Sequence, residues 1–128
     1  MRTSLVIPAY NEVEGLPLVV REYLDVVDEV IMVDDGSSDG TFQAAQALVG
    51  GKVKLLRHEV NQGKVAALRT GVVQASGDVI IFTDADNTYP ARYVPQLVQE
   101  IEKGADLVLG ARIQARENIP AFNRLGNN

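Results

Sequence analysis

Short β-branched runs alternate with segments of helical spacing along almost the whole chain, and this alternation constrains the fold more than any other feature. Five runs are expected as buried strands: Ser4–Ile7, Val30–Val33, Val53–Leu56, Val79–Phe82 and Leu107–Leu109. Between them, apolar residues recur at intervals of three and four, which predicts helices within residues 13–24, 42–48, 65–72 and 94–101. Strands separated by helices require parallel neighbours and right-handed crossovers. The sequence therefore predicts an α/β fold, a three-layer α/β/α sandwich around a mostly parallel sheet.

Composition narrows the class of protein further. The chain has 128 residues, of which 46% are hydrophobic and 23% charged, values typical of one globular domain with a packed core. The absence of cysteine excludes disulfides and thiolate chemistry. The apolar runs are far shorter than the ~20 residues that span a bilayer, and the start of the chain does not resemble a signal peptide. We therefore expect a cytoplasmic location, or one at the cytoplasmic face of a membrane.

The charge is acidic overall and unevenly distributed. The formal net charge of −5 is the wrong sign for a protein that neutralises a nucleic-acid backbone, so nucleic acid is not expected as a partner. Residues 1–111 carry most of the acidic side chains, whereas residues 112–128 carry Arg112, Arg116 and Arg124 against a single Glu117. Residues 113–128 also lack clear periodicity. We expect them to form a loop with a short helix.

Acidic residues follow the fourth predicted strand. Ligands of parallel sheets bind beyond the carboxyl ends of the strands, where the strand order reverses. Asp84 and Asp86 emerge there at a spacing of two residues, and such carboxylates repel each other unless a cation lies between them. Mg²⁺ and Mn²⁺ prefer carboxylate oxygens and usually share them with substrate phosphates. The pair predicts a divalent metal with a phosphorylated ligand; the alternative is an acidic, solvated turn.

The loop after the second predicted strand contains two adjacent carboxylates. Ser38 and Asp39 are explained by turn formation and capping of the next helix. Capping does not explain Asp34 and Asp35, which we interpret as acceptors of hydrogen bonds from a base or ribose. The predicted ligand is therefore a nucleotide.

The other strand ends offer less specific candidates. Tyr10 can stack on a base, and Glu12 can bond to a ribose hydroxyl, although the same residues can also be a strand exit and a helix start. Lys64 is read equally well as a phosphate contact and as a solvated side chain. His58 has no partnering carboxylate or cysteine pattern near it in the sequence, so a structural or surface role is expected.

Four segments together resemble the family 2 glycosyltransferases with the GT-A fold. They are VIPAYNE, VDDGSSDGT, NQGKVAALRTGVVQASGD and FTDADNTYP, each at the end of a predicted strand, within a resemblance from residue 4 to about residue 112. Within the family, the chain is most similar to the dolichyl- or polyprenyl-phosphate sugar synthases, in the segments DADNTYP and GAR and in the Pro-Asn-Arg-Gly-Asn pattern near the end of the chain. The resemblance implies a Rossmann-like nucleotide-diphospho-sugar transferase fold. Residues 1–112 would form the donor-binding domain, and residues 113–128 the start of an acceptor-side region in a chain shorter than the family's.

The resemblance also implies roles for particular residues. The residues that correspond to substrate-binding positions of the family are Pro8, Tyr10, Glu12, Val33, Asp35, Asp84, Ala85, Asp86 and Arg112. Asp84 and Asp86 belong to the family's DxD-type motif and are the implied metal ligands, and Asp86 and Arg112 are the implied catalytic residues. Thr88 departs from the pattern, because some polyprenyl-phosphate synthases carry a metal-binding Gln at this place.

The implied activity is transfer of a hexose from a nucleotide-diphospho-sugar, GDP-mannose or a UDP-sugar, to a polyprenyl or dolichyl phosphate. The reaction would be an inverting displacement assisted by Mg²⁺ or Mn²⁺. A lipid phosphate is already ionised near neutral pH, so the acceptor needs no general base. Arg116 and Arg124 either hold that phosphate or form a solvated basic tail, and peripheral membrane association follows from the first reading. The sequence leaves the sugar, the base, the metal and the oligomeric state open.

Two alternatives remain. The first is a sugar-nucleotide-binding module without turnover, because the family's chains normally continue beyond the position of Asn128 and supply acceptor-binding elements. The second is a haloacid-dehalogenase-type phosphatase with Asp84 as nucleophile and Asp86 as acid. In that class the motif lies on the first strand, whereas here it follows the fourth predicted strand.

Overall fold

The computed structural model describes residues 1–86, 90–104, 107–111 and 121–125. The chain forms two compact units, Met1–Pro90 and Ala91–Asn128, which are described separately. The first unit contains a four-stranded sheet in the order β3-β2-β1-β4, and every neighbouring pair is parallel. The strands are β1 (Thr3–Ala9), β2 (Glu29–Asp35), β3 (Val53–His58) and β4 (Val79–Phe82). The first four predicted strands and their parallel arrangement are confirmed. The expectation that all of them are buried is wrong for β4, which has no buried residue, and for the middle of β3, because both strands lie at the edges of the sheet.

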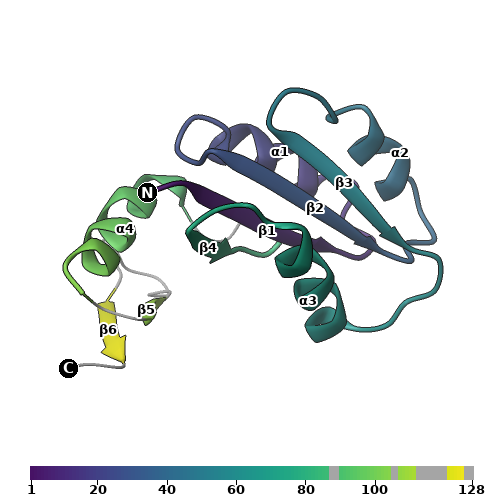
Figure 1. Cartoon of the computed structure of the whole chain (residues 1–128). Coiled ribbons are helices and arrows are strands. Elements are labelled where there is room, and N and C mark those ends of the chain that lie inside the picture. The colour runs from purple at the N-terminus through teal and green to yellow at the C-terminus, as the bar shows by residue number, and fades with distance from the viewer. Residues whose placement is uncertain (87–89, 105–106, 112–120, 126–128) are drawn as a thin grey trace. The chain divides into compact units, whose positions relative to one another are not determined.

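Three helices cover the two faces of this sheet. They are α1 (Gly15–Tyr23), α2 (Thr41–Gln46) and α3 (Lys64–Gln74), and each lies within or close to a predicted helix. Figure 1 shows α1 and α2 behind the sheet and α3 in front of it. The first unit therefore has the three layers that the alternation of strands and helices predicts.

The core follows from the position of β1 and β2 in the middle of the sheet. All seven residues of β2 are buried, because a central parallel strand has a helix layer on each face. On one face, Val6, Ile31 and Val33 form a buried cluster with Ala67 of α3. Helix α1 contributes its own buried apolar residues, Leu16, Val19, Val20 and Tyr23. Burial on both faces explains the four consecutive apolar residues Val30–Val33 in the middle of β2.

The strand order reverses at β1. The chain proceeds from β1 to β2 and β3 on one side and then crosses to β4 on the other side of β1. In open α/β sheets such a reversal leaves a crevice at the carboxyl ends of the strands. The loops after β1 and β4 meet at this edge, so the topology places the VIPAYNE and FTDADNTYP segments together.

The second unit contains a short 3₁₀ turn η1 (Ala91–Tyr93), α4 (Val94–Glu102) and the strands β5 (Leu107–Ala111) and β6 (Ala121–Leu125). The positions of the fourth predicted helix and the fifth predicted strand are confirmed. The expectation of a parallel neighbour is wrong for this strand, because within the described residues β5 pairs with β6 alone, antiparallel, in a separate two-stranded sheet. The expectation of a loop with a short helix over residues 113–128 is wrong for residues 121–125, which pair with β5 as an antiparallel strand. The segment AFNRL lacks the alternation of a strand, so its conformation depends on pairing with β5 rather than on local pattern. Residues 112–120 lie outside the described part of the chain.

The helices of the described residues are short. None of them is long and apolar enough to cross a membrane.

A buried carboxylate stabilises the amino-terminal edge of the sheet. Glu29, at the start of β2, is 1% exposed and accepts hydrogen bonds from Ser4 Oγ (2.6 Å), Lys54 Nζ (2.7 Å) and the Ser76 amide (2.9 Å). Burial raises the pKa of Glu29, but these hydrogen bonds together outweigh burial and lower the pKa to about 2. Glu29 is therefore held ionised within the folded protein.

This network predicts a pH dependence of stability. Because the pKa of Glu29 is lower in the folded protein than the ordinary value of 4.5, its contribution is complete above about pH 4.5 and is lost as the pH falls toward 2. We expect a loss of about 3 kcal/mol in the free energy of unfolding over this range, and a clearly weaker dependence in Glu29→Gln. Urea unfolding at a series of pH values measures both slopes. Equal slopes in the two proteins would contradict the assignment.

Candidate functional site

The carboxyl ends of the four parallel strands surround a cavity of about 340 Å³. Every strand end contributes to its wall. The lining residues are Pro8, Ala9, Tyr10, Glu12, Asp35, Asn61, Gly63, Lys64, Asp84, Ala85 and Asp86. The structure thus brings together strand-end segments that are separated by up to about 75 residues in the sequence, at the edge where the sequence predicts a ligand.

Most of the predicted site residues line this cavity. They are Pro8, Tyr10, Glu12, Asp35, Asp84, Ala85 and Asp86. Val33 does not line it: its side chain is fully buried in the cluster beneath α3. Arg112 and Arg116 lie outside the described residues, as does Thr88, and Arg124 lies in β6 opposite Val108.

The acidic loop after β4 has a basic partner that the sequence did not identify. Lys64 Nζ lies 2.6 Å from Asp84 Oδ1, and both side chains line the cavity. Lys64 is the first residue of α3, twenty positions before Asp84, and the crossover from α3 to β4 returns the chain to the same edge. Asp86 is exposed in the wall of the same cavity. Lys64 therefore lies in the cavity wall beside Asp84. Its side chain is 60% exposed, so both the phosphate contact and the solvated side chain remain possible roles.

The backbone of this acidic loop is supported by α1. A Cβ atom added to Gly15 would lie 2.2 Å from the carbonyl oxygen of Ala85, far closer than any normal contact. Only a residue without a side chain fits between the start of α1 and the loop that carries Asp84 and Asp86. Helix α1 therefore fixes the position of the two carboxylates through backbone contact.

The loop after β1 is tied to the loop after β2. Asn11 has a positive φ of 53°. Its backbone N–H donates a hydrogen bond to Ser37 Oγ (2.9 Å), and its side-chain oxygen accepts one from the backbone N–H of Ser38 (2.9 Å). The Glu12 amide donates to Thr41 Oγ1 at 2.9 Å. These bonds hold the backbone directly after Tyr10, whose ring remains half exposed at the cavity. The ring is available for stacking on a flat ligand.

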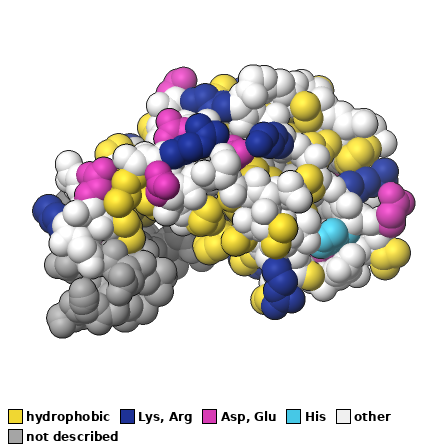
Figure 2. All heavy atoms as spheres, viewed as in Figure 1, with side chains coloured by type: hydrophobic (Ala, Val, Ile, Leu, Met, Phe, Trp, Pro, Cys, Tyr) yellow, Lys and Arg dark blue, Asp and Glu magenta, His cyan; other side chains and the backbone are white. Residues whose placement is uncertain are grey.

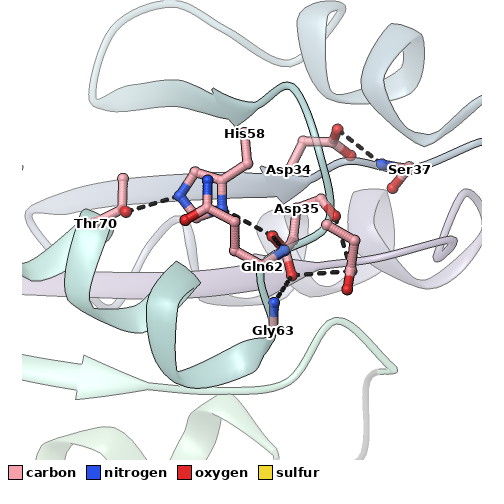
Figure 3. Close-up of polar contacts among 8 residues, drawn as sticks. Asp34, Asp35, Ser37, His58, Gln62, Gly63 and Thr70 are labelled. Atoms are coloured by element: carbon pink, nitrogen blue, oxygen red, sulfur yellow. Dashed lines mark hydrogen bonds and ion pairs between the residues drawn. The ribbon is translucent and has the colours of Figure 1, made fainter.

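The two adjacent aspartates at the end of β2 do not share a role. Side chains alternate along a strand, and Figure 3 shows Asp34 directed toward Ser37 and Asp35 toward His58 and Gly63. Asp34 is fully buried and accepts a hydrogen bond from the Ser37 amide (3.3 Å), and its Oδ1 has no hydrogen-bond partner among the residues that the structure describes. The prediction that both carboxylates face a nucleotide is therefore wrong for Asp34, because only Asp35 reaches the cavity.

Asp35 is the centre of a hydrogen-bond network that includes His58 (Figure 3). Its carboxylate lies 2.8 Å from His58 Nδ1 and accepts from the amides of Gln62 and Gly63, each at 2.9 Å. Burial raises the pKa of Asp35, but the hydrogen bonds from Gln62, His58 and Gly63 outweigh it and lower the pKa below its usual value. The structural role expected for His58 agrees with its burial. The expectation that it has no carboxylate partner is wrong, because the register of β2 and β3 places Asp35 beside His58.

The residues of the cavity fit a divalent cation. Asp84 and Asp86 supply hard carboxylate oxygens, the ligands that Mg²⁺ and Mn²⁺ prefer. In the described residues, no group of three or more His, Asp or Glu side chains is arranged to hold a metal. The two carboxylates suit an ion that takes its remaining ligands from water and from the phosphates of a substrate.

Charge elsewhere is mixed. On the face shown in Figure 2, the basic side chains drawn in dark blue lie interspersed with acidic and hydrophobic ones. In the described part of the cavity wall, Lys64 is the one cationic side chain, against Glu12, Asp35, Asp84 and Asp86. An anionic ligand would therefore need an added cation to offset the carboxylates.

Residues 4–127 match the family described as Glycosyl transferase family 2. Because the match covers almost the whole chain, the protein belongs to this family, and the fold of its parallel sheet is the GT-A fold. The family assignment replaces the phosphatase alternative.

Curated relatives place the chain near polyprenyl-phosphate sugar transferases. Dolichol-phosphate mannosyltransferase of Pyrococcus furiosus is 34% identical over 133 residues, which cover 98% of this chain and 38% of that protein. Undecaprenyl-phosphate 4-deoxy-4-formamido-L-arabinose transferase of Pseudomonas fluorescens is 38% identical, and the match covers 94% of this chain and 38% of that protein. The bactoprenol glucosyl transferase of Shigella phage SfV is 37% identical, and the match covers 88% of this chain and 39% of that protein. The chain thus spans well under half the length of these relatives.

Solved structures agree with this fold. Glucosyl-3-phosphoglycerate synthase of Mycobacterium tuberculosis, in complex with uridine diphosphate, superposes with a TM-score of 0.74 at 28% identity, covering 90% of this chain and 45% of that one. The same synthase in complex with Mn²⁺ and uridine-diphosphate-glucose gives a TM-score of 0.68 at 30% identity, covering 80% and 40%. Both structures of this synthase hold a uridine nucleotide, and one also holds Mn²⁺, on a fold similar to that of this chain.

Proposed function

We propose that the chain binds a nucleotide-diphospho-sugar in the cavity and forms the donor-binding part of a transferase that moves a hexose to a polyprenyl phosphate. The observation that carries the proposal is the convergence of Tyr10, Asp35 and the Asp84–Asp86 loop on one cavity at the strand reversal. The Mn²⁺ and uridine-diphosphate-glucose bound to a structural neighbour support the same ligand class. A donor of this kind needs both a flat surface for its base and a charged surface for its diphosphate, and the cavity contains both.

The wall of the cavity suggests an orientation for the donor. Pro8, Tyr10 and Glu12 of the loop after β1 and Asp35 of β2 would face the nucleoside, with Val33 supporting this end of β2 from the core. The Tyr10 ring would stack on the base, and Glu12 would accept from the ribose. The diphosphate would lie toward Lys64 and the Asp84–Asp86 loop. In this orientation Lys64, the one cation among the described residues of the cavity wall, lies nearest to the most negative part of the ligand.

Asp84 and Asp86 would hold Mg²⁺ or Mn²⁺, which offsets the charge that develops on the diphosphate as it leaves. Asp86 is exposed in the cavity wall, and Asp84 keeps one oxygen beside the ammonium of Lys64. Lys64 neutralises Asp84 before the donor arrives and adds a second positive charge near the diphosphate afterwards. Arg112, which follows β5, would supply a further cation to the leaving group and act as a catalytic residue with Asp86.

The acceptor side is proposed from the relatives and from charge. The matched relatives are named for dolichol phosphate and undecaprenyl phosphate, and an ionised phosphate oxygen can attack the anomeric carbon without a general base. Attack from the side opposite the leaving diphosphate inverts the configuration at that carbon. Arg116 and Arg124 would hold the acceptor phosphate, and the protein would then act at a membrane surface, which we propose to be the cytoplasmic face.

Calorimetry tests the donor site. We expect GDP, UDP or one of their hexose conjugates to bind in the presence of Mn²⁺ or Mg²⁺, and the affinity to fall by about tenfold or more when EDTA removes the metal. The base and sugar that bind most tightly identify the donor. Absence of metal-dependent binding to any of these nucleotides would refute the proposed function.

A donor-binding module without turnover is the second candidate. The chain covers only 38–39% of the length of the matched relatives. The remaining part of each relative can supply an acceptor site. A transfer assay with the identified donor and polyprenyl phosphate separates the two candidates. Formation of the lipid-linked sugar supports the transferase, whereas binding without product supports the module.

A further inference from the structure

The carboxylate of Asp35 has all of its hydrogen-bonding positions in use within the protein. Oδ1 meets His58 Nδ1 (2.8 Å) and the Gln62 amide (2.9 Å). Oδ2 accepts from the Gly63 amide (2.9 Å) and from Asn61 Nδ2 (3.1 Å). An ionised carboxylate offers about four lone-pair sites, so four donors saturate it. Although Asp35 lines the cavity, its carboxylate therefore mainly holds neighbouring protein groups in position.

Three of the four donors belong to one segment of the cavity wall. Residues 61–63 lead from β3 into α3, and Asn61, Gly63 and the following Lys64 all line the cavity. Asn61 also donates to the backbone oxygen of Asp35 at 3.0 Å. The loop after β2 lies directly against this segment, because a Cβ atom on Gly36, whose φ is +74°, would be only 2.5 Å from the Asn61 nitrogen. Asp35 thus fixes the wall segment from which Lys64 projects.

The fourth donor is His58, which lies behind the cavity wall. It is 7% exposed and is not among the residues that line the cavity. Because ionised Asp35 can only accept, Nδ1 of His58 carries a hydrogen and donates it. Nε2 of the same ring lies 2.8 Å from Thr70 Oγ1 in α3 (Figure 3). The Thr70 hydroxyl can donate or accept, so it holds the ring in place in either protonation state of His58.

We propose that His58 is a positioning residue for donor binding: oriented by Thr70, it holds the Asp35 carboxylate, which in turn holds residues 61–64 in the cavity wall. The inference rests on the proposed donor-binding function. His58 acts without touching the nucleotide. A chain of hydrogen bonds from α3 through His58 and Asp35 to the Gln62 and Gly63 amides links the core to the wall that carries Lys64.

Two pairs of variants separate positioning from mere packing. His58→Asn places an amide nitrogen near the position of Nδ1 and keeps a donor for Asp35, whereas His58→Leu fills the space and removes the donor. Thr70→Ser keeps the hydroxyl that orients the ring, whereas Thr70→Val removes it with little change in volume. We expect His58→Leu and Thr70→Val to weaken binding of UDP or GDP with Mn²⁺ roughly tenfold, and the two conservative variants to stay within about threefold of wild type.

A second readout does not depend on the nucleotide. The amides of Gln62 and Gly63 are held by Asp35, so hydrogen exchange followed by NMR should be faster at these two amides in His58→Leu and Thr70→Val. Exchange in the conservative variants should match wild type. Thermal unfolding of all four variants identifies any effect that spreads through the whole fold.

The outcomes distinguish this inference from the proposed function. If folded His58→Leu binds nucleotide as tightly as wild type and its Gln62 and Gly63 amides are equally protected, the positioning role is overturned. If His58→Leu fails to fold, the same comparison between Thr70→Val and Thr70→Ser decides. If wild type binds no nucleotide, the proposed function fails, and with it the claim that His58 serves donor binding; the exchange rates then decide only whether His58 orders the segment.

Discussion

Replacing Asp86 with alanine is expected to abolish the metal dependence of nucleotide binding. Asp86 is exposed in the cavity wall. Asp84 forms an ion pair with Lys64, whose Nζ lies 2.6 Å from Asp84 Oδ1. Without Asp86, the cation would therefore meet a single carboxylate whose charge is partly neutralised. With Mn²⁺ present, we expect the Kd for the nucleotide to rise by about tenfold or more, to the value that wild type shows in EDTA. Calorimetry of both proteins with and without Mn²⁺ measures the effect.

The matched control is Asp25→Ala. Asp25 is exposed and follows α1, at the edge of the sheet opposite the cavity, so the substitution removes the same charge without touching the site. Its nucleotide affinity and metal response should equal those of wild type. If Asp86→Ala keeps the full response to Mn²⁺, the metal is held elsewhere and the assignment of the DxD-type loop is incorrect.

The sheet could be predicted from the sequence because its central strands β1 and β2 are buried on both faces. A central parallel strand carries a continuous apolar run, such as Val30–Val33 in β2, and this run gives a strong local signal between helical segments. Strand β6 gives no such signal. Its segment contains Asn123 and Arg124 and becomes a strand by pairing with β5, a partner that local periodicity does not reveal.

The site could be predicted in outline for a related reason. Parallel strands all present their carboxyl ends at one edge, so polar residues at strand ends must meet, and the structure brings Tyr10, Asp35 and Asp86 to one cavity. The partners within the site could not be predicted. His58 meets Asp35 through the register of two strands, and Lys64 meets Asp84 through a helical crossover. The two pairs are 23 and 20 residues apart in the sequence, distances that neither helical nor strand periodicity relates.

The alternation of side chains along β2 also limited the prediction. Adjacent carboxylates look equivalent in the sequence, but the pleat sends Asp34 toward Ser37 and Asp35 toward the cavity and His58 (Figure 3). The same pleat places Val33 in the core beneath α3. The residues at this strand end therefore divide among core packing, turn formation and the cavity wall.

Gly15→Ala is expected to displace the Asp84–Asp86 loop from the side of α1, where Gly15 lies against Ala85. The new methyl group would lie 2.2 Å from the Ala85 carbonyl oxygen, so either α1 or the Asp84–Asp86 backbone must move. We expect the free energy of unfolding to fall by about 1–3 kcal/mol and the nucleotide affinity with Mn²⁺ to fall as well.

Gly40→Ala is the matched control, because Gly40 also stands at the start of a helix and neither glycine has a positive φ. A Cβ atom on Gly40 meets only a Val13 methyl group at 3.6 Å, an ordinary contact. Its stability should be unchanged or slightly raised, since alanine restricts the unfolded chain. Urea unfolding and calorimetry of both variants give the comparison. If Gly15→Ala behaved like Gly40→Ala, the loop that carries Asp84 and Asp86 would be free to move away from α1, and the two carboxylates would be positioned by the ligand rather than by the fold.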